Sequence, residues 1–171
     1  PFITFVVAAA AMFPMGGATV VAIRMGRGDK KGANDAFIMS LTLTFLISAA
    51  LMAFGMIFAE KIVDLSGAVR LSAEMRKMAA DYLFYYSAFS IPMLMSTCLS
   101  VFVRNDGSPG LSFAGMCAGA AANIFLDWPF IFPFEMGVIG AAVASGLGQI
   151  LSVAVLLVHF IKKRGILRVS K

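Results

Sequence analysis

Of the 171 residues, 60% are hydrophobic and only 13% are charged, the formal net charge is +5, and the mean hydropathy is +0.91. Soluble domains are roughly half apolar and about a quarter charged. This composition therefore excludes an ordinary soluble domain and indicates an integral membrane protein.

The charged residues are clustered, and they leave apolar runs near or above the roughly 18 to 20 residues that cross a bilayer core of about 30 Å. We predict an all-α, polytopic transmembrane helix bundle with five spans. The spans cover residues 2–23, 36–59, 78–103, 111–134 and 138–161, and a tail follows at 162–171. Because the chain starts at Pro1, beside the first span, we expect it to be a fragment of a longer protein.

The basic residues predict the orientation in the membrane. Ten of the 14 Lys and Arg residues fall on one side: Arg24, Arg27, Lys30, Lys31, Arg104, Lys162, Lys163, Arg164, Arg168 and Lys171. Since Lys and Arg near span ends stay on the cytoplasmic side, the tail is predicted to be cytoplasmic and the N-terminus outside. The net charge then reflects topology rather than a nucleic-acid partner, and a bacterial inner membrane fits this pattern.

The connections between spans carry recognisable turn signals. Asp29 is placed to cap the helix that follows the first connection. In RNDGSPG, residues 104–110, an Asp106-Gly107 turn precedes Ser108 as an N-cap and Pro109 at the first helical position. The third and fourth spans are therefore expected to form an antiparallel hairpin.

Small residues are frequent in the last two spans. Gly115 and Gly119 form a G-x-x-x-G pattern, and the stretch GVIGAAVASGLGQ follows at 137–149. Such spacing favours close approach of helices in a membrane.

Asp127 is the only acid deep within a predicted span. A carboxylate near the bilayer centre costs about 2.5–3.5 kcal/mol even on a lenient scale, and such residues usually face the bundle interior and serve a pathway. Asn123 lies one turn earlier on the same helix face. Pro129 cannot donate to the carbonyl of Phe125, so a kink is expected there. Oxygen ligands suit Na⁺, a buried carboxylate equally suits a proton, and a packing hydrogen bond is the structural alternative.

Four segments carry a resemblance to a known family. GRGDKKGA, RNDGSPG, NIFLDWPFIF and GVIGAAVAS occur in the order and spacing of the multidrug and toxic compound extrusion (MATE) family. The chain resembles the amino-terminal lobe of such a transporter over residues 16–159, from its second to its sixth helix. The resemblance implies one part of a six-helix lobe in a two-lobe transporter, with the first helix and the second lobe missing here.

The resemblance also implies a site and an activity. In the family, the Asn and Asp of this motif and a hydroxyl residue on the next helix take part in a cation site. Asn123 and Asp127 match, and Ser145 stands where threonine is common; a first-helix aspartate is absent. The implied activity is secondary antiport that exports organic, cationic compounds against H⁺ or Na⁺ by alternating access. No enzyme, no cofactor and no metal other than Na⁺ at Asp127 and Asn123 is expected.

For the other candidate residues, a structural explanation accounts for the residue at least as well as a functional one. Met95 and Met116 would suit an adaptable drug cavity, and Trp128 and Phe132 would stack on an aromatic or cationic drug, but lipid-facing packing or interfacial anchoring explains them as well. His159 is expected to stand alone, which argues against hydrolytic or metal catalysis. The predicted partners are membrane lipid, a small-molecule drug, and the missing first helix and second lobe.

Two rival functions remain open from sequence. A lipid-linked sugar exporter of the same architecture would present a strongly basic cavity, yet no Lys or Arg lies deep in a span. A non-transporting membrane scaffold would pair Asp127 with a basic residue of a partner.

Overall fold

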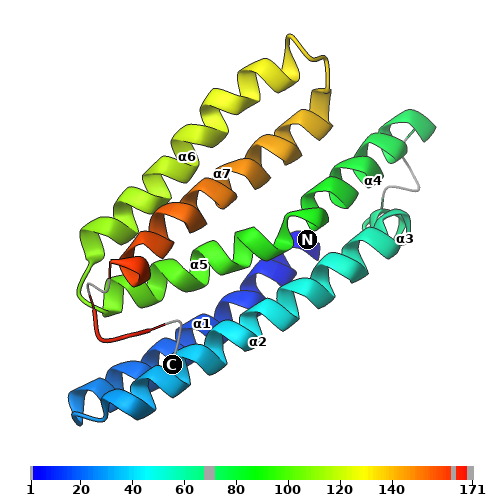
Figure 1. Cartoon of the computed structure of the whole chain (residues 1–171). Helices are drawn as coiled ribbons and strands as arrows, with labels where there is room; N and C mark the ends of the chain where they lie inside the picture. The colour runs from blue at the N-terminus through cyan, green and yellow to red at the C-terminus, as the bar shows by residue number, and fades with distance from the viewer. Residues whose placement is uncertain (1, 68–71, 163–164, 169–171) are drawn as a thin grey trace.

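The computed structural model describes residues 2–67, 72–162 and 165–168, and these contain helices without strands, as predicted. The described residues form seven helices, and Figure 1 shows their arrangement. They are α1 (Phe2–Gly26), α2 (Lys30–Ile57), α3 (Ala59–Leu65), α4 (Ala73–Ala88), α5 (Ser90–Asn105), α6 (Pro109–Ile131) and α7 (Gly137–Ile161).

Two antiparallel helix pairs flank α5. The pair α1–α2 packs on one side of α5 and the pair α6–α7 packs on the other (Figure 1). Phe37 of α2 joins the two sides, because its ring meets Phe102 of α5 edge to face at 5.0 Å and stacks on Phe160 of α7 at 5.2 Å between centroids. The main core therefore lies where α2, α5 and α7 meet.

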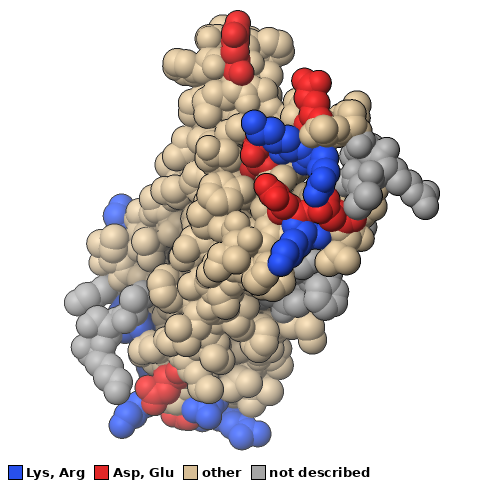
Figure 2. All heavy atoms as spheres, turned by 90° about the vertical axis from the view of Figure 1, so that its right-hand side faces the viewer, with Lys and Arg blue, Asp and Glu red and all other residues tan. Residues whose placement is uncertain are grey.

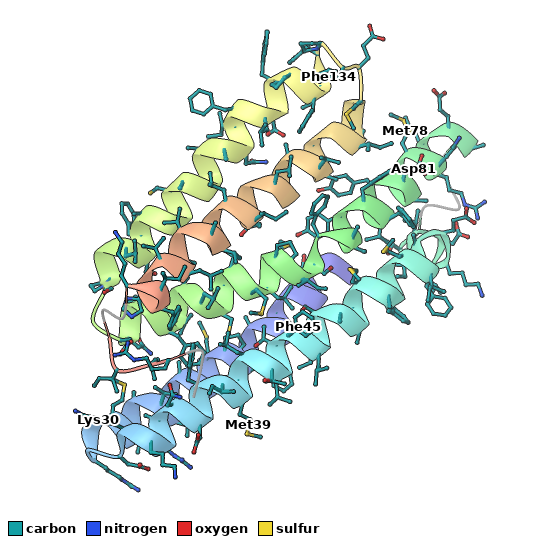
Figure 3. All side chains as sticks on the ribbon, in the orientation of Figure 1. Lys30, Met39, Phe45, Met78, Asp81 and Phe134 are labelled. Atoms are coloured by element: carbon teal, nitrogen blue, oxygen red, sulfur yellow. The ribbon has the colours of Figure 1, made fainter. Side chains whose placement is uncertain are left out.

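The apolar exterior is that of a membrane protein. Met39 and Phe45 on α2 are 64% and 48% exposed, and Met39 points away from the bundle in Figure 3. Lys30 and Asp81 lie near opposite ends of the molecule (Figure 3). Figure 2 shows Lys, Arg, Asp and Glu gathered at the bottom of the visible face and in a group at its upper right that reaches about half-way down, with other residues covering most of the remaining surface.

Three helices, α2, α6 and α7, are long and apolar enough to cross a membrane, and the pair α4–α5 makes a fourth crossing if it counts as one broken span. This count applies to the described part of the chain. The predicted first span falls on α1, whose passage through a membrane stays a prediction. The predicted fifth span, 138–161, lies within α7.

The predicted third span, 78–103, falls on α4 and α5, which are long and apolar enough to cross a membrane only when taken together. Its helix breaks at Phe89, and α4 and α5 meet at an angle of 50°. Pro92 explains the break, because it has no N–H to donate to the carbonyl of Ala88 and its ring crowds that carbonyl. The other expected ends also shift, since α2 begins six residues before 36 and α6 ends at Ile131 rather than 134.

The turn predictions agree with the structure in most details. Asp29 caps α2, its Oδ1 accepting from the backbone N–H of Gly32 at 2.9 Å. Ser108 precedes α6 and Pro109 opens it, but the Ser108 side chain makes no capping hydrogen bond. Gly107 has φ +85°, a conformation that favours glycine, so it supplies the turn of the α5–α6 hairpin.

Candidate functional site

Asn123 on α6 and Ser145 on α7 are brought together by the packing of these two helices. The Asn123 Nδ2 donates to the Ser145 Oγ at 3.1 Å. Asp127 lies one turn further along α6, and its Oδ1 is buried without a hydrogen-bond partner among the described residues. The amide and the hydroxyl therefore meet at the α6–α7 interface, and one oxygen of the Asp127 carboxylate, one turn further along α6, has no hydrogen-bond partner among the described residues.

Glycines set the spacing of this interface. A Cβ on Gly148 would lie 2.6 Å from the Gly119 carbonyl oxygen, and a Cβ on Gly119 would lie 2.9 Å from the Gly148 carbonyl oxygen. A Cβ on Gly115 would likewise lie 2.9 Å from Leu156. The predicted close packing of the glycine-rich helices is confirmed, and it places the backbones in contact one turn from Asn123.

A cavity of about 590 Å³ adjoins the Asn123–Ser145 pair and is lined from α1, α4, α5, α6 and α7. Its polar lining includes Asn123, Ser145, Gln149, Ser152, Ser96, Thr97, Ser100 and Arg104. Asp127 is not among the lining residues. Among the described residues of that lining, Arg104, in the last turn of α5, is the single charged side chain.

Gln149 and Ser152 line the cavity, although the sequence alone assigns them no function. Ser145, Gln149 and Ser152 follow one another at i, i+4 and i+7 along α7, the spacing of one helix face. That periodicity is the signal that identifies Gln149 and Ser152 as cavity residues. Ser152 also accepts from the Ser96 hydroxyl at 3.0 Å, which ties α7 to α5.

The weaker candidates fall in different places. Met116 lines the cavity, together with Met15 and Met93, whereas Met95, Trp128 and Phe132 are not lining residues. Trp128 and Phe132 are 65% and 67% exposed in this chain.

Pro129 lies in the last turn of α6, which ends two residues later at Ile131. Because proline has no N–H, the carbonyl of Phe125 lacks its usual helical partner. This carbonyl belongs to the same stretch of α6 as Asp127.

The prediction that His159 stands alone is wrong. Its Nε2 lies 2.9 Å from Asp106 Oδ2, and both side chains are buried. The two residues are 53 positions apart, so no local sequence pattern relates them. Among the described residues, no three His, Cys, Asp or Glu side chains form a group able to hold a metal ion.

Comparison with known proteins identifies the family of this chain. The MatE family model matches residues 1–129. The multidrug export protein MepA of Staphylococcus saprophyticus is 28% identical over 161 residues, which cover 93% of this chain and 35% of that protein. MepA of Staphylococcus aureus is 24% identical with the same coverage.

Solved structures agree in fold. A multidrug resistance MATE transporter of the MOP superfamily in an inward-facing conformation superposes with a TM-score of 0.89 at 23% identity, covering 99% of this chain and 38% of that one. An outward-facing conformation gives 0.86 at 24% identity with the same coverage.

The chain spans about 35% to 38% of the length of the relatives it matches, as expected of part of a larger transporter. Those relatives are transporters and export proteins rather than enzymes. Because the family model covers well over half of the residues, the chain belongs to the MatE family of membrane transporters.

Proposed function

We propose that this chain forms part of the amino-terminal lobe of a multidrug exporter that moves organic, cationic compounds outward in exchange for H⁺ or Na⁺. The observation that carries the proposal is the Asn123–Ser145 hydrogen bond across α6 and α7, one turn from the unpartnered buried Oδ1 of Asp127. The names of the staphylococcal relatives, both multidrug export proteins, support the class of cargo.

The residue chemistry fits a small cation or a proton. With its Nδ2 donating to Ser145, Asn123 keeps its carbonyl oxygen as an acceptor, and the Ser145 hydroxyl keeps a lone pair. These oxygens and the Asp127 carboxylate are hard ligands of the kind that suits Na⁺. A proton on Asp127 would remove the same buried charge. The coupling event is therefore neutralisation of Asp127, by either ion.

In the proposed transport cycle, the lobe moves as one rigid body. Structures of related transporters in inward-facing and outward-facing conformations match this chain almost equally well, which supports a lobe that keeps its fold while the two lobes rock. The cavity extends from Asn123 and Ser145 to Arg104. Arg104 lies in the basic set that the positive-inside rule assigns to the cytoplasm, so the cavity extends from the cation site towards that side.

Ethidium efflux tests this function directly. Cells expressing the full-length parent are loaded with ethidium, and a Na⁺ gradient and an H⁺ gradient are imposed separately. We expect efflux to follow one gradient and to stop when that gradient is collapsed. Absence of efflux under both gradients would contradict drug antiport and favour the lipid-linked sugar exporter or the scaffold.

Ser145→Ala should weaken the cation site without destroying it. The change removes the acceptor of the Asn123 hydrogen bond, worth about 1 kcal/mol, or roughly a fivefold change in an equilibrium. The concentration of coupling ion needed for half-maximal efflux is therefore expected to rise about fivefold. Ser145→Thr keeps the hydroxyl and is expected to behave like the parent; equal behaviour of the Ala variant would remove Ser145 from the site.

A further inference from the structure

Asp106 is a buried carboxylate that the proposed transport mechanism does not use. It follows α5 directly, and its side chain is only 1% exposed. Burial of a charge is costly unless hydrogen bonds compensate for it. The partners of Asp106 therefore show what this residue holds in place.

Three donors meet the Asp106 carboxylate, and two of them come from the polypeptide after α7. The backbone N–H of Ile166 donates to Oδ1 at 2.9 Å, and that of Leu167 donates to Oδ2 at 3.2 Å. His159, in the last turn of α7, places its Nε2 2.9 Å from Oδ2. Hydrogen bonds to an ionised acceptor are among the strong ones, so this carboxylate binds both the end of α7 and the segment beyond it.

The same segment is held at two further points. The Leu167 side chain is fully buried in the main core. The backbone N–H of Arg168 donates to Asn34 Oδ1 on α2 at 2.6 Å. A Cβ on Gly165 would collide with the Asp106 carboxylate, so glycine permits the close approach. Figure 1 shows residues 165–168, in red, running across the end of the bundle toward α1 and α2.

We propose that Asp106, with Asn34, is an anchor that fixes the segment 165–168 to this end of the lobe. The anchor joins α2, the α5–α6 connection and α7 through one stretch of backbone. In the two-lobe exporter proposed above, it fixes where the connection to the other lobe leaves this one; only this consequence depends on the proposed function.

Hydrogen exchange of the full-length protein in lipid nanodiscs tests the anchor without any transport assay. In the parent, the amides of Ile166 and Leu167 are expected to exchange far more slowly than unstructured amides. Asp106→Asn should accelerate both by roughly tenfold or more, since bonds to a charged acceptor are lost. Asp35→Asn, an exposed acid on α2 beside Asn34, is the matched control and should leave them unchanged.

A second pair of variants tests the proposal if Asp106→Asn fails to fold. Asn34→Ala removes only the acceptor of the Arg168 N–H, so that amide alone should exchange faster. Gly165→Ala should displace the segment from Asp106 and accelerate exchange at Ile166 while the amides inside α7 stay protected. Unprotected amides in the parent, or unchanged exchange in all of these variants, would overturn the anchor.

Discussion

Asp127→Asn in the full-length transporter is expected to abolish ion-coupled export while membrane insertion and thermal stability stay close to those of the parent. Asparagine has nearly the size of aspartate but carries no charge that Na⁺ or a proton can neutralise. The Asp127 Oδ1 has no hydrogen-bond partner among the described residues, so the change breaks no bond there. The loss should therefore affect the coupling event rather than the fold.

The measurement is ethidium efflux under separately imposed Na⁺ and H⁺ gradients, combined with the amount of protein in the membrane. Efflux should fall to the level of cells without the transporter. Glu135→Gln is the matched control, because Glu135 is an exposed acid in the α6–α7 connection and its neutralisation should leave efflux intact.

Two outcomes would contradict this role for Asp127. Normal, gradient-driven efflux by Asp127→Asn would show that the carboxylate is structural. Loss of a membrane complex with no change in ion or drug flux would favour the scaffold, in which Asp127 pairs with a basic residue of a partner.

Features with a local cause could be predicted from sequence. The Asp29 cap depends on a side chain reaching an N–H three residues ahead, and Pro109 opens α6 because its ring suits the first helical turn. Gly115 and Gly119 share a helix face by spacing alone, and the structure places both against α7. Only the family resemblance, not the local sequence, indicates that Asn123 and Ser145 belong together, and the structure joins them by a direct hydrogen bond between α6 and α7.

Features that depend on distant contacts could not be predicted in this way. The Asp106–His159 pair joins residues 53 positions apart, and a lone histidine in an apolar sequence gives no sign of its partner. The broken third span is a different case, because Pro92 carries a local signal that the continuous hydropathy of the region conceals. Hydropathy indicates whether a segment is surrounded by lipid or by water, whereas a proline determines whether its helix is continuous.

The tight contact between α6 and α7 makes Gly119→Val the second substitution with a large expected effect. Even the first atom of the new side chain would lie 2.9 Å from the Gly148 carbonyl oxygen and 3.0 Å from the Ser152 Cβ. The nearest obstacle is the backbone carbonyl of Gly148, which cannot change rotamer as a flexible side chain would. Relief requires the helices to separate, and overpacking of this kind costs about 1–3 kcal/mol.

Gly110→Val provides a control on the same helix, because a Cβ on Gly110 meets nothing within 4 Å. Thermal unfolding of the purified full-length protein should show Gly119→Val melting roughly 1–3 °C below the parent, with Gly110→Val close to the parent. Separation of α6 from α7 would also lengthen the Asn123–Ser145 hydrogen bond, so ion-coupled efflux should fall together with stability. If Gly119→Val kept both stability and coupling, the glycine contact would not be what positions the proposed cation site, and the Asn123–Ser145 distance would have to be set by the rest of the bundle.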